Sequence, residues 1–409
     1  MALHGEASRP LAGLRVLEIS SYVAAPFAGK TLAQLGATVV RVDPIGGAPD
    51  RHRWPLAPSG ASLFWTGLNM GKRSLTIDVA DERGRAIVHA WLAACPPSTA
   101  VVLTNSIGRS WLSPAALRRH APDLIHVQIE GRSDGSGAVD YTVNAETGLP
   151  MVTGPVDYDG PVNHVLPAWD IACGLYAALG VSAAALRRAE TGEGCDLTIA
   201  LEDVALSVTA GLGHYAEAYL QGIDRPRVGN HIYGTFGRDF RCADGDRIIV
   251  ATVTARQWRE LLDLTESAAA VATLEQALEV DFRDEAQRYR QREALAAIIE
   301  RWFARHSRSE AEAVLAGSTI PWGRYRTFRE IAEAAAGQGA PEIFTMLDQP
   351  GVGIHPAAGS PLRVDDRRSN ASSAPILGAD SETVLHELGW ESRDIAALMR
   401  AGIVGEGIG

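Results

Sequence analysis

Cysteine and lysine are both scarce in this chain of 409 residues, which contains four cysteines and two lysines. No two cysteines form a Cys-x-x-Cys pair, so the sequence predicts free thiols rather than a disulfide scaffold or a zinc site. Residues 1–19 lack the charged-then-apolar pattern of a secretion signal. No run of 18 apolar residues occurs either, so we expect a cytoplasmic protein without a membrane-spanning helix.

Positive charge is in deficit as well. Asp and Glu number 49 against 38 Lys and Arg, which gives a net charge of −11. A surface of this sign repels nucleic acids and anionic membranes, so neither is expected as a partner. Any anionic ligand must therefore be held by a local basic cluster. The apolar share of 46% and the charged share of 21% are those of a globular protein, here long enough for about two to four domains.

Several well-known signatures of catalysis are missing too. The chain has no glycine-rich phosphate loop ending in Lys, no His-Glu-x-x-His and no Gly-x-Ser-x-Gly. The small residues of 20–26, which lie between the first predicted strand and helix, do not form a Gly-x-Gly-x-x-Gly fingerprint. Such residues either let backbone N–H groups approach an anion or make a plain tight turn, and the local sequence supports both readings equally.

Strand and helix patterns alternate through the first third of the chain. Apolar strand patterns alternate with helical ones, which predicts βαβ units, a parallel sheet and a Rossmann-like α/β domain. The predicted strands are 14–19, 38–43, 74–78, 100–104 and 124–129, and the predicted helices are 26–36, 82–94 and 114–120.

The rest of the chain predicts a second, smaller domain. Residues 131–163 form a long Gly- and Pro-rich irregular segment, followed by helices at 167–189 and 201–221 around a short strand at 195–199. Composition changes near Arg225. We therefore predict a large α/β domain at 1–225, a small α+β domain at 226–330, and a return of 331–409 to the large domain.

A few side chains are candidates for chemistry on local grounds. Asp170 follows Pro167-Ala-Trp and begins an apolar helix, so it is either an N-cap or a carboxylate nucleophile able to form acyl intermediates. His164 is either an acid–base group or a structural histidine. Basic residues gather at 51–53, at 72–73, and at Arg109 with Arg132; they either bind a phosphate or carboxylate or are solvated surface charges.

Several stretches taken in order resemble the family III CoA transferases over essentially the whole chain. These stretches are 23–44, 69–78 (Asn-Met-Gly-Lys-Arg-Ser-Leu-Thr-Ile-Asp), 103–105, 359–362, 374–378 and 401–404. The resemblance implies an interlocked homodimer of a CoA-binding α/β domain and a smaller domain. It also implies that no cofactor or metal is held permanently, because CoA arrives as part of the substrate.

Further stretches resemble the subgroup that moves CoA between the two carboxyl groups of one molecule of mesaconate, a reaction that suits carbon fixation. They are 43–47, 53–55, 139–144, 148–150, 163–165, 167–171 and 233–239. In that reading, Asp170 is the catalytic aspartate, which forms mixed anhydrides and an aspartyl-CoA thioester.

The resemblance carries further roles onto single positions. Ala24, Lys72, Asn105 and Arg109 match positions that contact CoA. Arg53 is the candidate partner of a substrate carboxylate, and Asp140, Tyr141 and His164 are candidate substrate contacts near the nucleophile.

Two departures from the family pattern limit the alternatives. A CoA-contacting Lys of some formyl-CoA transferases falls at Ala138, and the histidine of the related racemases falls at Val139. A racemase would need that histidine as one of its two bases, so the sequence argues against racemase activity. The remaining alternatives are CoA transfer between two separate small dicarboxylic acids and a non-catalytic CoA-binding protein.

Overall fold

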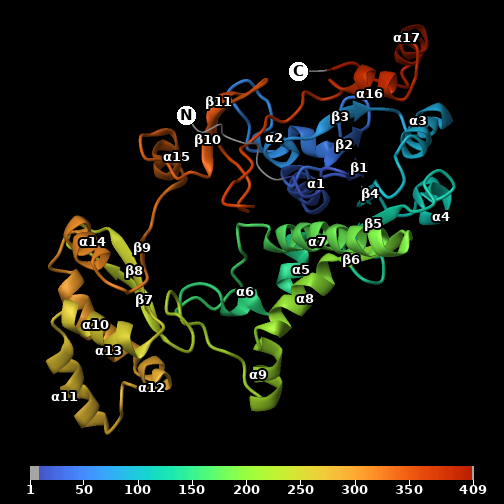
Figure 1. Ribbon diagram of the computed structural model, residues 1–409. Coiled ribbons are helices and arrows are strands. Elements are labelled where there is room, and N and C mark those ends of the chain that lie inside the picture. The colour runs from blue at the N-terminus through green and yellow to red at the C-terminus, as the bar shows by residue number, and fades with distance from the viewer. Residues whose placement is uncertain (1–8, 408–409) are drawn as a thin grey trace. The chain divides into compact units, whose positions relative to one another are not determined.

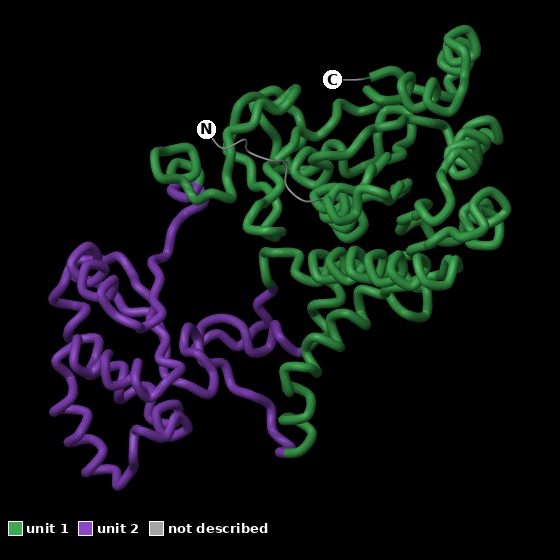
Figure 2. Tube along the Cα trace, viewed as in Figure 1, with its two compact units in different colours: residues 1–147, 164–220, 332–409 green, residues 148–163, 221–331 purple. Residues whose placement is uncertain are grey.

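The computed structural model describes residues 9–407 and divides them between two compact units (Figure 2). The larger unit comprises 1–147, 164–220 and 332–409, and the smaller comprises 148–163 and 221–331. Residues 1–8, part of the stretch in which we found no secretion signal, lie outside the described residues.

The larger unit is built on a six-stranded parallel sheet, as the sequence predicts (Figure 1). Its strand order is β3-β2-β1-β4-β5-β6. The strands are β1 (Arg15–Ile19), β2 (Thr38–Asp43), β3 (Arg73–Thr76), β4 (Ala100–Thr104), β5 (Ile125–Glu130) and β6 (Cys195–Ala200). The direction of winding reverses between β1 and β4, which opens a crevice at the carboxyl ends of these two strands.

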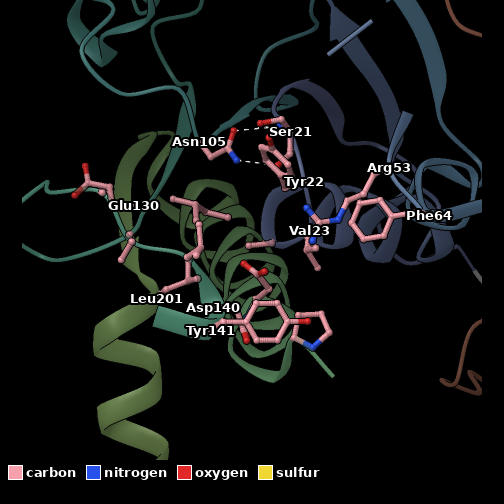
Figure 3. A pocket seen from close by; sticks show the side chains of 18 of the residues that line it. Ser21, Tyr22, Val23, Arg53, Phe64, Asn105, Glu130, Asp140, Tyr141 and Leu201 are labelled. Carbon is pink, nitrogen blue, oxygen red and sulfur yellow. Dashed lines mark hydrogen bonds between the residues drawn. The ribbon is translucent and has the colours of Figure 1, made fainter. Parts of the chain in front are cut away.

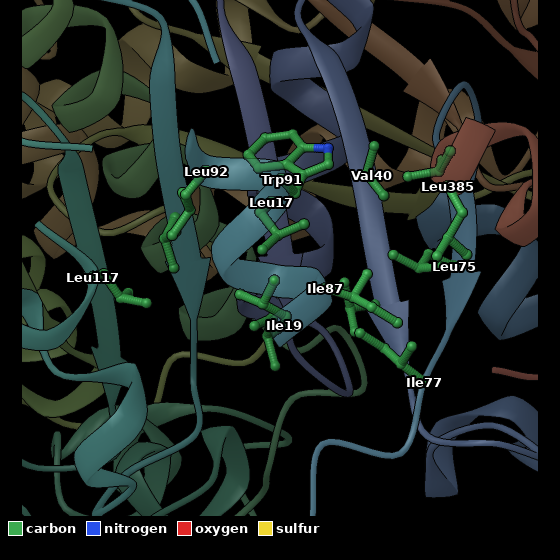
Figure 4. Close-up of a cluster of buried hydrophobic side chains, with 14 of the residues drawn as sticks. Leu17, Ile19, Val40, Leu75, Ile77, Ile87, Trp91, Leu92, Leu117 and Leu385 are labelled. Atoms are coloured by element: carbon green, nitrogen blue, oxygen red, sulfur yellow. The ribbon is translucent and has the colours of Figure 1, made fainter. Parts of the chain in front are cut away.

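Helices cover both faces of this sheet. On one face, α1 (Ala24–Gln34) packs along α7 (Ala168–Thr191), which also contacts β5 and β6. On the other face, α3 (Glu82–Ala93), α16 (Ser381–Glu387) and α17 (Ser392–Arg400) cover the strands. Figure 4 shows this second interface, where Trp91, Ile87 and Leu385 pack against strand residues. Each fully buried large apolar side chain contributes about 1.5–3 kcal/mol.

By length and composition alone, α7 could span a membrane, since it has 24 residues and contains an 18-residue stretch with a mean hydropathy of 1.5. Its packing identifies it as a core helix of the larger unit instead. Near its end, the buried Arg188 guanidinium donates to the carbonyl oxygens of Ala100 and Asp123. A charged group held inside the fold in this way is part of a folded interior rather than of a lipid-facing segment.

Three further helices of the larger unit lie where the sequence predicts helix: α4 (Pro114–Leu117), α8 (Leu201–Gly211) and α9 (His214–Gln221). The sequence did not indicate the other elements, which are η1 (Pro49–His52), α2 (Leu63–Asn69), η2 (Ser110–Leu112), α5 (Asp140–Ala145), β10 (Phe344–Gln349) and β11 (Gly353–Ala358). The helix predicted over 201–221 is two helices, because Gly213 adopts a φ of 82° that ends the first one.

The smaller unit has its own antiparallel sheet and its own core. Strands β7 (Phe236–Arg241), β8 (Arg247–Thr252) and β9 (Trp322–Arg324) pair in that order. The helices are α6 (Leu149–Val152), α10 (Ala255–Leu264), α11 (Ala268–Leu278), α12 (Glu285–Arg290), α13 (Arg292–Phe303) and α14 (Arg308–Ala316), and α15 (Phe328–Ala336) crosses into the larger unit. The core includes stacked Phe240 and Phe303.

Candidate active site

A cavity of about 680 Å³ lies in the larger unit at the carboxyl edge of the sheet (Figure 3). Its wall combines the ends of β1, β4 and β5 with the starts of α1, α5 and α7. The loops after β1 and β4 are tied together across the crevice. The backbone N–H of Ser21 donates to Asn105 Oδ1 (3.2 Å), and Asn105 Nδ2 donates to the carbonyl oxygen of Ser21 (2.9 Å). The predicted CoA contacts Ala24 and Asn105 both line this cavity.

The turn after β1 is held in an uncommon conformation. Tyr22 has a φ of 65°, which L-residues other than Asn and Asp rarely adopt. Its backbone N–H donates to Asp50 Oδ2 at 3.0 Å, and Asp50 is itself buried. This anchor orients the Tyr22 ring along the cavity wall and sets the start of α1.

Arg53 faces the same cavity with an exposed side chain. Its guanidinium lies 5.6 Å from the ring centroid of Tyr22 and 5.0 Å from that of Phe64. Within residues 9–407, no carboxylate forms an ion pair with it, and it is the only Lys or Arg in the cavity wall. A planar cation held by aromatic faces and left without an anion is suited to bind a carboxylate of a ligand.

Asp170 lies in the first turn of α7 and lines the cavity. The pKa of its carboxyl is raised to about 7, because burial and, after it, the charge of Asp140 raise the pKa more than Arg53 lowers it. A carboxylate of this basicity, once ionised, is a stronger nucleophile than an ordinary aspartate.

Asp140 and His164 form a pair directly behind Asp170. His164 Nε2 donates to Asp140 Oδ1 at 2.6 Å. Asp140 Oδ2 accepts from the backbone N–H groups of Trp169 (2.7 Å) and Asp170 (3.1 Å). The exposed fraction of Asp140 is 1%, whereas the neighbouring Tyr141 is exposed and its hydroxyl donates to the carbonyl oxygen of Val165. Of the three candidate substrate contacts, Tyr141 and the buried Asp140 line the cavity, and the side chain of His164 is 24% exposed.

Lys72 does not line the cavity. It is buried, and its ammonium donates to Glu18 Oε1 (3.0 Å), to the carbonyl oxygen of Pro26 (2.9 Å) and to Asn69 Oδ1 (2.9 Å). Burial lowers the pKa of Lys72 to about 8, although the nearby Glu18 charge raises it. All three ammonium protons are therefore used inside the protein, and none is left for a phosphate.

The same buried network continues through Arg41. Its guanidinium donates to Asp43 (2.9 Å), to Asp50 (3.1 Å) and to Asn69 (3.2 Å). Because Asp50 also accepts from the Tyr22 N–H, this network supports the turn that lines the cavity. The sequence analysis did not identify Glu18, Arg41 or Asp50, since nothing local indicates that their charges pair across the fold.

Arg109 lies at a second, smaller cavity of about 170 Å³. The residues around it come from the carboxyl ends of β1 and β2 and from the loop after β4, and include Ser20, Asp43, Pro44 and Trp111. The structure thus places six of the predicted site residues at one cavity, namely Ala24, Arg53, Asn105, Asp140, Tyr141 and Asp170, and Arg109 at another on the same edge of the sheet.

Comparison with known proteins relates the chain to one family. The model of CoA-transferase family III matches residues 11–381. The chain is 44% identical to the 2-methylfumaryl-CoA isomerase of Chloroflexus aurantiacus, over 96% of this chain and 97% of that protein. It is 25% identical to a formyl-CoA:oxalate CoA-transferase of Rhodopseudomonas palustris, over 97% of each chain. Among solved structures, a CaiB/BaiF family protein from Brucella suis superposes with a TM-score of 0.75 at 26% identity, covering 94% of this chain and all of that one.

Proposed function

Because this chain belongs to CoA-transferase family III, we propose that it moves CoA within one molecule, converting 2-methylfumaryl-CoA (mesaconyl-C1-CoA) into 3-methylfumaryl-CoA (mesaconyl-C4-CoA). The observation that carries the proposal is the presence of a basic carboxylate, Asp170, and an unpaired guanidinium, Arg53, in one cavity. The 44% identity to a 2-methylfumaryl-CoA isomerase over nearly the full length supports the same substrate.

In the first half of the reaction, the Asp170 carboxylate attacks the thioester carbonyl at C1. The C–S bond breaks, CoA leaves as a thiolate, and a mixed anhydride between Asp170 and mesaconate remains. The thiolate then attacks the aspartyl carbonyl, which gives an aspartyl-CoA thioester and releases mesaconate as a dicarboxylate.

The second half repeats these steps at the other end of the acid. The C4 carboxylate attacks the aspartyl-CoA carbonyl, expels the thiolate and forms a second anhydride. The thiolate attacks the C4 carbonyl, which yields the product and restores the Asp170 carboxylate. No proton or external acid is consumed, so the cavity must retain mesaconate between the two halves.

Arg53 accounts for this retention. The two carboxylates of mesaconate lie at opposite ends of a planar trans chain. When one end reacts at Asp170, the other faces the guanidinium, and after the acid turns end for end their places are exchanged. The Tyr22 and Phe64 rings beside Arg53 provide flat walls for the planar acid.

CoA itself is a substrate and not a resident cofactor in this proposal. Ala24 and Asn105 would contact its thioester arm, and Arg109 would meet its phosphates. The chain would act as a homodimer, which is supported by exposed apolar side chains on α7, α8 and α9. These include Leu175, Leu179, Leu186, Leu206 and Tyr219.

Isotope exchange tests the intramolecular part. The protein is incubated with mesaconyl-C1-CoA and an excess of labelled free mesaconate, and the CoA esters are analysed by mass spectrometry. We expect isomerisation with little label in the ester pool. Label entering the esters at the rate of turnover would show that the enzyme transfers CoA between separate dicarboxylic acids.

A further inference from the structure

Helix α5 presents two buried polar side chains to the first turn of α7. Asp140 and Asn144 lie one helical turn apart, and both are almost fully buried. Asn144 Oδ1 accepts from the indole Nε1–H of Trp169 at 3.0 Å. Asp140 Oδ2 accepts from the backbone N–H groups of Trp169 and Asp170. Helix α5 therefore fixes Asp170, the proposed nucleophile, by a hydrogen bond to its own backbone N–H and by hydrogen bonds to the preceding Trp169.

The first turn of α7 needs such support because it has no cap of its own. Its N-cap position is Pro167, whose side chain accepts no hydrogen bond. The first N–H groups of a helix have no partner within that helix. Asp140 supplies two of these bonds from a separate helix, so the position of Asp170 depends on where α5 holds this carboxylate.

His164 completes the arrangement by occupying the other oxygen of Asp140. Edge-on contact with Tyr141 fixes the imidazole ring in turn, with the ring centroids 5.8 Å apart. Asp140 lies in the cavity wall, but both of its oxygens are bonded to protein groups and its exposed fraction is 1%, so the side chain is engaged mainly by α7 and His164.

From this geometry we infer that Asp140 is a positioning residue, which fixes the backbone of the nucleophile Asp170, and that His164 anchors Asp140 for that purpose. The inference rests on the proposed function and replaces the substrate-binding roles expected for these two residues. Of the four residues expected to bind the substrate, it leaves Arg53 and Tyr141 in that role.

The charge of Asp140 also changes a measurable quantity, the pKa of the Asp170 carboxyl. Among the groups that face Asp170, Asp140 and burial raise the pKa of its carboxyl, and Arg53 lowers it. The other titratable groups nearby are His164, Tyr141, Glu130 and, one turn along α7, Cys173. Removing the Asp140 charge while keeping an acceptor oxygen must therefore lower the pKa of Asp170.

Two variants separate position from charge. In Asp140→Asn the amide oxygen still accepts from α7, so we expect kcat within about tenfold of wild type and the acid limb of the pH–rate profile about one unit lower. In Asp140→Ala the negative charge and the acceptor oxygen are both lost, so kcat should fall about 100-fold while KM for the CoA ester stays within about threefold. The exposed Asp134→Asn, a matched loss of charge, should change neither quantity.

His164 is tested by conservative rescue. His164→Gln keeps an N–H donor for Asp140 and should retain most of the kcat that His164→Ala loses. A tenfold or larger rise in KM at unchanged kcat in Asp140→Ala would show that the side chain contacts substrate, and would overturn the inference. Equal kcat in the Gln and Ala variants of His164 would remove the anchoring role.

A substrate-free measurement keeps this inference distinct from the proposed function. The carboxyl ¹³C resonance of Asp170, identified by its absence in Asp170→Asn, is titrated in wild type and in Asp140→Asn. We expect the midpoint to fall in the variant. If that shift occurs while wild type fails to isomerise mesaconyl-CoA, the proposed function fails and the placement of Asp140 stands. An unchanged midpoint would contradict the inference whatever the activity.

Discussion

The ammonium of Lys72 lies 2.8 Å from Glu18 Oε2, and both side chains are fully buried. The two residues come from β1 and from the loop before β3, and they join a network that also contains Arg41, Asp43 and Asp50. Removing one partner of a buried ion pair leaves the other charged and unsolvated. The conspicuous lysine of the Lys72-Arg73 pair therefore stabilises the fold under the β1–α1 turn.

Lys72→Met should destabilise the protein by about 3–5 kcal/mol, because it leaves the Glu18 carboxylate without its cation. Urea denaturation measures this loss, and KM for the CoA ester of the folded protein should change little. Lys30→Met is the matched control, and we expect less than about 1 kcal/mol there because Lys30 forms no ion pair within residues 9–407. A large rise in KM without loss of stability would instead make Lys72 a CoA contact.

Asp170→Asn should lower turnover by at least about 10³-fold, because an amide cannot form the anhydride. In wild type, turnover should rise with pH through about 7, since only the ionised carboxylate attacks. The measurement is kcat between pH 5 and 9. A rate that is flat across pH 7, or substantial activity in the variant, would rule out Asp170 as the nucleophile.

Ionisation of the Asp170 carboxyl should lower the free energy of unfolding of the protein. Its pKa is raised in the folded state above the ordinary value of 3.8, so the folded protein binds the proton more tightly than the unfolded chain does. Stability attributable to this group is then present below pH 4 and lost as pH rises through about 7. We expect Asp170→Asn to be more stable than wild type by on the order of 2 kcal/mol at pH 8, with little difference at pH 4. Denaturation at the two pH values checks this sign.

Arg53→Ala should raise KM for mesaconyl-CoA about 100-fold while leaving the affinity for free CoA nearly unchanged, since the guanidinium meets the free carboxylate of the acid. Arg53→Lys should recover only part of this loss, because an ammonium cannot make two parallel bonds. Steady-state kinetics and calorimetric titration with CoA measure the two effects. Equal losses in both would place Arg53 on CoA rather than on the acid.

The contact between α1 and α7 depends on one glycine. A Cβ atom on Gly174 would lie 2.6 Å from the carbonyl oxygen of Ala24, which is backbone and cannot rotate away. Gly174→Ala should therefore cost about 1–3 kcal/mol and disturb the cavity wall at Ala24. Gly180→Ala on the same helix is the control, because its Cβ would meet only the end of the flexible Leu197 side chain, at 3.2 Å.

Much of the sheet follows from the sequence, because each parallel strand is a short apolar run between turn signals. The predicted strands 38–43 and 100–104 match β2 and β4 residue for residue. Helix α2 and the β10–β11 hairpin were missed, since their sequences lack a clear period and are stabilised by contacts with distant segments.

The site shows a similar division. The local sequence made Asp170 and Arg53 candidates, the family resemblance gave each a role, and the structure places both at one cavity. The hydrogen-bond partners of Asp140 and Lys72 could not be predicted from the sequence. Asp140 meets residues 24 to 30 positions away, and Lys72 meets Glu18 at a separation of 54. Such pairings depend on the folded topology, and no local pattern encodes them.

The most direct test of the account is to mix the purified protein with mesaconyl-C1-CoA alone, without added acid, and to separate the products by chromatography with mass detection. The account predicts a new isomer of unchanged mass, mesaconyl-C4-CoA, and no product with Asp170→Asn. If wild type leaves the ester unchanged until a second carboxylic acid such as succinate is added, the protein is an intermolecular CoA transferase and the central claim is wrong.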